Sequence, residues 1–74
     1  MQKAITSQNY INLTSYLKKR RLELGLSMRD LGERIDQPHS FVQKLEDGQK
    51  KLDIYQYVQY CEALELDAPE TLRI

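Results

Sequence analysis

The chain has 74 residues, of which 41% are hydrophobic and 30% charged, a length and balance that suit one small folded domain. Its single cysteine and single histidine exclude an internal disulfide and a clustered metal site, so we expect no metal and no other cofactor. No apolar run approaches the ~20 residues of a membrane span, and the N-terminus lacks the apolar core of a signal peptide. A cytoplasmic protein without membrane contact is therefore expected. The absence of a paired nucleophile and base, and of a phosphate loop, argues against an enzyme.

The net charge is zero, but the charges are unevenly distributed along the chain. Residues 1–51 contain ten Lys and Arg and six Asp and Glu, which gives +4. Residues 52–74 contain one basic and five acidic residues, which gives −4. This asymmetry favours a basic working surface with an acidic remainder over a chance arrangement of solvated charge.

The apolar spacing is helical throughout, and no stretch alternates with the two-residue period of a strand. We expect residues 1–12 to be a flexible N-terminal segment and residues 13–74 to form one domain. The first helix is predicted over residues 15–24, with Thr14 as its N-cap and Gly25 as its C-terminal stop. Its buried side is predicted to contain three leucines, Leu13, Leu17 and Leu24.

A second short helix is predicted to follow Ser27, which can cap it together with Asp30 in an acidic variant of the capping box. Leu31 and Ile35 then point inward, four residues apart on one helical face. Residues 36–37 are expected to end the second helix and to separate it from a third.

The third helix is predicted over residues 38–46, with Pro38 in its first turn and Gly48 in a left-handed conformation at its exit. At 100° per residue, its two faces differ in polarity. The apolar side consists of Pro38, Phe41, Val42 and Leu45, and the polar side consists of His39, Ser40, Gln43 and Lys44. For an isolated amphipathic helix, such a polar face is usually interpreted as a solvent-exposed surface without further function.

The context of the third helix favours a second interpretation. A short helix that follows another across a tight turn is the element that fits the major groove of B-DNA. Lys44 can donate to guanine O6 and N7, and Gln43 can bond adenine N6 and N7. His39 and Ser40 can reach either bases or phosphates.

The C-terminal part is predicted to contain a fourth helix, which opens at Asp53 with Gln56 three residues later, and a short fifth helix from residue 67. The apolar stripe of the fourth helix consists of Ile54, Tyr57, Val58, Cys61 and Leu64. Tyr55 and Tyr60 lie off this stripe. They are either further core residues or part of a dimer surface, which we expect in this acidic half of the chain.

The stretch LKKRRLELGLSMRDLGERIDQPHSFVQKLEDGQKKLD, residues 17–53, resembles the phage-repressor and Cro-like (XRE) helix-turn-helix domain. The matching positions are Arg21, Gly25, Leu26, Ser27, Leu31, Val42, Leu45, Glu46 and Gly48. The resemblance covers roughly residues 13–72. It implies an all-α, compact five-helix bundle of the lambda-repressor-like type, and a DNA-binding transcriptional regulator that inserts residues 38–46 into the major groove.

The resemblance also implies roles for individual residues. Arg21 and Glu46 are expected to form a structural ion pair. Base readout is assigned to His39, Ser40, Gln43 and Lys44, and phosphate contact to Ser27, Arg29, Gln49, Lys50 and Lys51. The chain departs from the family pattern at three positions, with Met28 for a phosphate-binding Gln, Gly32 for a small Ala, and Asp36 for the turn Gly.

Two functions therefore remain open. The leading hypothesis is a repressor-like regulator that binds double-stranded DNA as a two-fold homodimer. The alternative is an antitoxin-like or anti-repressor interaction module, whose third or fourth helix docks on a protein partner such as a toxin or a co-regulator. The zero net charge is the main support for this alternative.

Overall fold

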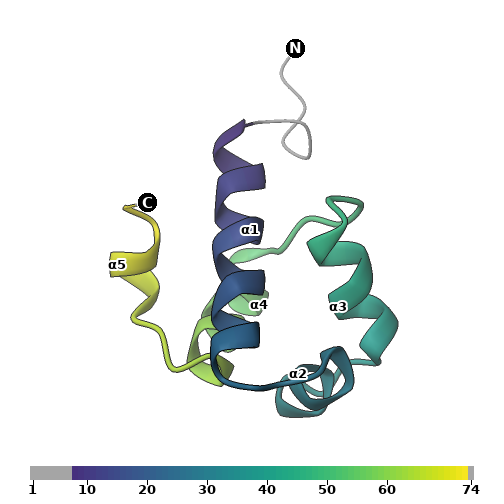
Figure 1. The fold of residues 1–74 in the computed structure, drawn as a ribbon. Helices are drawn as coiled ribbons and strands as arrows, with labels where there is room; N and C mark the ends of the chain where they lie inside the picture. Colours follow the sequence, from purple (N-terminus) through teal and green to yellow (C-terminus); the bar gives the residue numbers. More distant parts are fainter. Residues whose placement is uncertain (1–7, 74) are drawn as a thin grey trace.

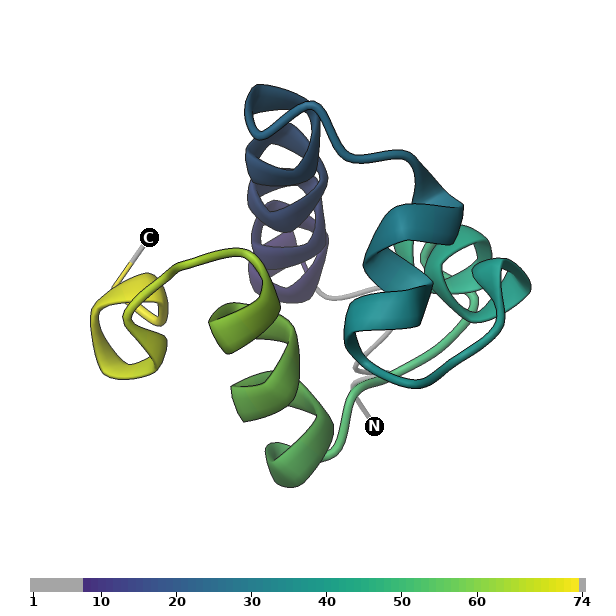
Figure 2. The same cartoon turned by 90° about the horizontal axis from the view of Figure 1, so that it is seen from below.

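The computed structural model describes residues 8–73, which form five α-helices and no strand. The helices are α1 (Gln8–Glu23), α2 (Met28–Arg34), α3 (His39–Glu46), α4 (Ile54–Ala63) and α5 (Ala68–Thr71). Figures 1 and 2 show α1 in the middle, with α2 and α3 on one side of it and α5 on the other. The predicted all-α, five-helix fold is confirmed. Among the described residues, no helix has the length and apolarity needed to cross a membrane.

The first helix begins seven residues earlier than predicted, at Gln8 instead of residue 15. Thr14 is therefore not an N-cap; it is buried inside α1, where its hydroxyl donates to the Ile11 carbonyl at 3.1 Å. A threonine within a helix can bond the preceding turn in this way, which satisfies its hydroxyl without ending the helix. Residues 1–7 lie outside the described residues, so a flexible segment there stays a prediction.

The turn between α2 and α3 follows the predicted pattern with one correction. Ser27 and Asp30 form the capping box of α2, with hydrogen bonds of 2.9 and 3.0 Å. Asp36 adopts a left-handed φ of 59°, a region that Asp tolerates better than most residues. Pro38 is the N-cap of α3 and is exposed, so its predicted place on the buried side is wrong. Its extended backbone puts the ring outside the first helical turn.

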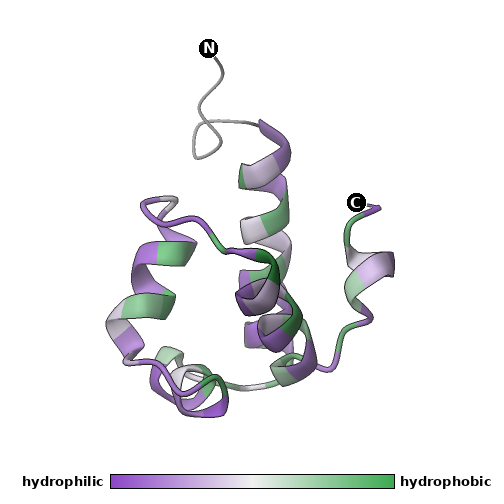
Figure 3. Cartoon of the chain, turned by 180° about the vertical axis from the view of Figure 1, so that it is seen from behind, coloured by the Kyte–Doolittle hydropathy of each residue, from purple (hydrophilic) through white to green (hydrophobic). Residues whose placement is uncertain are grey.

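The core is built from apolar side chains of the first four helices and from the C-cap residues of α2 and α4. Figure 3 shows hydrophobic and hydrophilic residues alternating along α3, as a half-buried helix requires. The buried cluster consists of Leu17, Leu31, Ile35, Phe41, Val42, Leu45, Tyr60 and Leu64.

The buried face of α4 differs from the predicted stripe. Ile54 is 83% exposed and Val58 is also exposed, whereas Tyr60 is only 1% exposed. Ile54 is the first helical residue after the Asp53 cap, at the solvent-exposed N-terminal end of α4. The inward face is therefore rotated toward Tyr60 and Cys61, and of the two alternatives for Tyr60, core or dimer surface, the structure shows the core.

Gly32 allows α2 and the start of α3 to approach each other closely. A Cβ atom on Gly32 would lie 2.5 Å from the carbonyl oxygen of Gln37, a distance that real Cβ contacts do not reach. The same turn is closed by a 2.8 Å hydrogen bond from the Gln37 amide to the Gly32 carbonyl. The position of α3 relative to α2 therefore depends on the absence of a side chain at Gly32.

We expect Gly32→Ala to lower the free energy of unfolding by roughly 1–3 kcal/mol, because the added methyl group forces the turn backbone apart. Alanine's better helix propensity, worth ~1 kcal/mol, opposes this loss without cancelling it. Urea unfolding measures the difference, with the exposed Glu33→Ala on the same helix as the control. A Gly32→Ala protein as stable as the wild type would show that the turn can open without cost.

Candidate nucleic-acid interface

The exposed face of α3 carries four polar side chains on the outer edge of the molecule. His39, Ser40, Gln43 and Lys44 are all exposed, whereas Phe41, Val42 and Leu45 on the opposite face are buried. Because the three buried residues fix α3 against the core, the four polar side chains have a defined direction. The structure thus brings the four residues predicted to read bases onto one surface.

The loop after α3 brings a second set of predicted residues next to this face. Gln49 and Lys51 are exposed, but Lys50 is half-buried, with its ammonium 5.2 Å from the centre of the Phe41 ring. This cation–π contact holds the Lys50 side chain against α3.

A small hollow of about 170 Å³ lies between α3 and Lys50. Its lining includes Ser40 and Lys44 from α3 and Lys50 from the loop. Two ammonium groups and a hydroxyl around one hollow provide positive charge and hydrogen-bond donors, which suit a phosphate oxygen. Lys50 therefore lies beside the α3 face, and its side chain lines the same hollow as Lys44.

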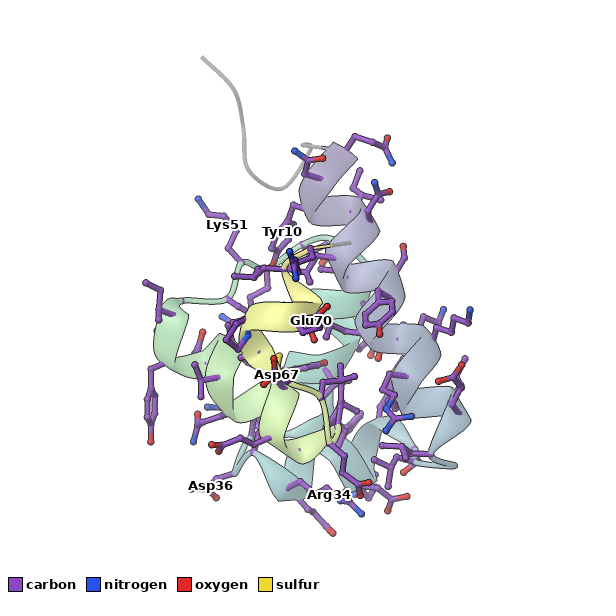
Figure 4. The ribbon with its side chains drawn as sticks, turned by 90° about the vertical axis from the view of Figure 1, so that its left-hand side faces the viewer. Tyr10, Arg34, Asp36, Lys51, Asp67 and Glu70 are labelled. Carbon is purple, nitrogen blue, oxygen red and sulfur yellow. The ribbon has the colours of Figure 1, made fainter. Side chains whose placement is uncertain are left out.

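The loop between α3 and α4, residues 47–53, is held at its start and near its middle. At its start, Gly48 has a φ of 78°, and the Gln49 amide donates to the Lys44 carbonyl at 2.8 Å. Near its middle, the Tyr10 hydroxyl donates to the Lys50 carbonyl at 2.8 Å and accepts from the Leu52 amide at 3.2 Å. Figure 4 shows Tyr10 and Lys51 at the same end of the molecule.

Our reading of the sequence missed Tyr10, because we placed it in a flexible segment. A signal was present: Tyr10 continues the helical spacing of Leu13 and Leu17 by one turn toward the N-terminus. The partners on the loop, about forty positions away, could not be found from periodicity.

The last two residues that were predicted to contact phosphates lie at the start of α2. Ser27 and Arg29 are both exposed. The Ser27 hydroxyl already accepts from the Asp30 amide, but a hydroxyl that accepts can still donate. The Asp30 carboxylate accepts from the Ser27 amide, and the hydrogen bonds to Ser27 lower the pKa of Asp30. This negative charge opposes a phosphate at Ser27, so Arg29 suits the predicted contact better than Ser27 does.

Arg21 and Glu46 form a two-pronged ion pair between α1 and the last residue of α3. Arg21 Nε lies 2.7 Å from Glu46 Oε2, and Nη2 lies 3.1 Å from Oε1. The remaining guanidinium nitrogen, Nη1, donates to the Leu26 carbonyl at 2.8 Å. The two side chains are only 7% and 2% exposed, so neither is available to DNA.

Two further arginines of the basic half also stabilise the fold. Arg20 Nε donates to the Leu64 carbonyl at 3.0 Å, and Arg34 Nη1 donates to the Ala63 carbonyl at 2.9 Å. Both bonds satisfy carbonyls at the C-terminal end of α4, where positive charge also suits the helix dipole. The positive charge of residues 1–51 is therefore partly structural, and no local pattern in the sequence could show this.

Tyr60 lies near the ion pair and not on the surface. Burial, and then the negative charge of Glu46, raise the pKa of its hydroxyl well above the usual range. The hydroxyl oxygen is buried and has no hydrogen-bond partner among the described residues.

We expect Arg21→Ala to lower the free energy of unfolding by ~3 kcal/mol, since it leaves the Glu46 carboxylate buried without a partner. The double variant Arg21→Ala/Glu46→Ala should cost less than the sum of the two single changes. Urea unfolding of the three variants measures this coupling, with the exposed Lys18→Ala on the same helix as the control. Strictly additive losses would show that the two side chains do not stabilise each other.

Comparisons with known proteins place this geometry in a family. The helix-turn-helix family model matches residues 17–70, which is more than half of the chain. The solved structure of an XRE-family like protein from Pseudomonas syringae pv. tomato str. DC3000 matches with a TM-score of 0.82 and 28% identity, over 88% of this chain and 79% of that one.

The clp gene regulator ClgR from Corynebacterium glutamicum matches with a TM-score of 0.81 and 22% identity, over 90% of this chain and 86% of that one, a likeness of fold alone. Among curated proteins, none matches the sequence significantly. The family match over most of the folded part shows that this chain belongs to the XRE family of helix-turn-helix DNA-binding proteins.

Proposed function

We propose that this domain is a sequence-specific DNA-binding transcriptional regulator, repressor-like in action, that inserts α3 into the major groove. The observation that carries the proposal is the exposed polar face of α3, at the outer edge of the molecule and backed by a buried apolar face. At eight residues, α3 is ~12 Å long, a length that lies within the major groove.

The side chains of this face have separate roles in the proposed complex. Gln43 and Lys44 lie at the centre of α3, where they donate to base edges. His39 and Ser40 lie at the N-terminal end of α3 and contact the flanking base pair or its phosphate. Because Gln43 is uncharged, its contribution depends on the base that it meets and not on the charge of the duplex.

The surrounding residues supply contacts to the DNA backbone. Lys51 and Gln49 are exposed on the loop after α3, and Arg29 is exposed at the start of α2. The hollow between Lys44 and Lys50 provides a place for one more phosphate oxygen. Such contacts set the position of α3 in the groove but carry no sequence information.

The proposed DNA-bound form is a two-fold dimer, because one helix of eight residues reaches only a few base pairs and two half-sites one helical turn apart supply the rest. A surface for a second copy lies around the start of α4. Ile54, Tyr55 and Leu72 are 83%, 71% and 63% exposed, and Ile54 and Leu72 border a largely apolar hollow of about 270 Å³.

Replacing Gln43 with Ala should cost ~1–3 kcal/mol of binding free energy on the specific operator and leave random-duplex affinity unchanged. Lys51→Ala should weaken binding to both duplexes to the same extent and reduce the salt slope by ~1. Anisotropy titrations at several salt concentrations, on an operator selected from random DNA, separate the two effects. If both variants lower the two affinities by the same ratio, α3 does not read bases, and the protein-interaction alternative is favoured.

Ile54→Glu should remove the cooperativity of the second binding event on a duplex with two half-sites while leaving the affinity for a single half-site intact. An acidic residue suits the N-terminal turn of α4, so the fold should remain. Analytical ultracentrifugation of the complexes measures the stoichiometry, with Leu22→Glu as a control at an exposed leucine of α1. A wild-type protein that binds such a duplex only as independent monomers would contradict the proposed dimer.

A further inference from the structure

The hydroxyl of Tyr10 holds the backbone on both sides of Lys51. It donates to the Lys50 carbonyl at 2.8 Å and accepts from the Leu52 amide at 3.2 Å. We infer that Tyr10 is a positioning residue for DNA binding, which sets the backbone of the loop that presents Lys50 and Lys51 to phosphates. This inference rests on the proposed DNA-binding function.

The loop depends on Tyr10 because its other hydrogen bonds lie at its two ends. The Gln49 amide is tied to the end of α3, and Asp53 caps α4 through the Gln56 amide at 2.7 Å. Within the described residues, the Lys50 carbonyl and the Leu52 amide have no backbone partner. Without the hydroxyl, the backbone at Lys51 has no hydrogen bond between the two ends, and only the packing of Leu52 on the core and the contact of Lys50 with the Phe41 ring restrain it.

Tyr10 itself is well placed for this task. It is half-buried on the first turn of α1, so its ring is held by the helix and by the apolar residues around it. It also lies before residues 17–70, the part of the chain that matches the family model. The first turns of α1 thus lie outside the part that matches the family model, and they contact the loop next to α3.

The energetic consequence concerns the cost of ordering the loop. A loop that is already ordered in the free protein loses little conformational entropy when its lysines meet phosphates. A loop without the Tyr10 bonds loses that entropy on binding, so the affinity falls. The fall is independent of DNA sequence, because phosphate contacts carry no sequence information.

The test compares Tyr10→Phe with Tyr57→Phe. Tyr10→Phe keeps the ring and removes the two loop bonds. Tyr57→Phe removes a tertiary hydrogen bond of the same kind, from Tyr57 to the Ala68 carbonyl at 2.6 Å between α4 and α5. We expect Tyr10→Phe to lower affinity for a single half-site duplex and for random duplex alike, by roughly three- to tenfold. Tyr57→Phe should leave both affinities unchanged at a temperature at which both variants are folded.

A double-variant cycle decides whether Tyr10 acts through the loop. In a Lys50→Ala/Lys51→Ala background, Tyr10→Phe should have no further effect on affinity, because the side chains that it positions are absent. Hydrogen exchange at the Leu52 amide should become faster in Tyr10→Phe and stay unchanged in Tyr57→Phe.

Two outcomes separate this inference from the proposed function. If the wild type binds duplex and Tyr10→Phe binds equally well, or if its effect persists in the double-lysine background, the inference is overturned and the proposed function stands. If the wild type binds no duplex at low salt, the proposed function is overturned, and the inference with it.

Discussion

The buried ion pair between Arg21 and Glu46 is the contact on which the geometry of the candidate interface depends. It joins α1 to the last residue of α3 through two hydrogen bonds, and a third bond reaches the loop that leads into α2. Because both charges are removed from water, the pair stabilises the fold only in this arrangement. Any shift of α3 along α1 would separate the charges, so the pair fixes the position from which the polar face points outward.

The basic residues of the chain divide into two groups by their surroundings. The arginines Arg20, Arg21 and Arg34 bond backbone carbonyls or a buried carboxylate, which uses the fixed, branched donors of the guanidinium group. Lys44 and Lys51 are exposed around α3, where a flexible point charge suits phosphates and base edges. The net charge of zero therefore says little about DNA binding, since it adds structural and surface charges together.

The N-terminal turns of α1 connect two surfaces that we propose to have different functions. Tyr10 lines the apolar hollow beside Ile54 and Leu72, and its hydroxyl bonds the loop that carries Lys50 and Lys51. One side chain thus lies between the proposed dimer surface and the proposed phosphate contacts.

The sequence by itself determined the features that depend on neighbours a few positions apart. The capping boxes at Ser27 and Asp53, the turn at Asp36 and the two faces of α3 follow from local hydrogen bonding and from the 3.6-residue period. Only the tertiary structure decided that Tyr60 is buried, that Arg20 and Arg34 cap α4, and that Tyr10 holds the loop after α3. The hydrogen bonds in that second set join residues 29 to 44 positions apart, and a periodic pattern along one helix contains no information about which distant backbone group a side chain will meet.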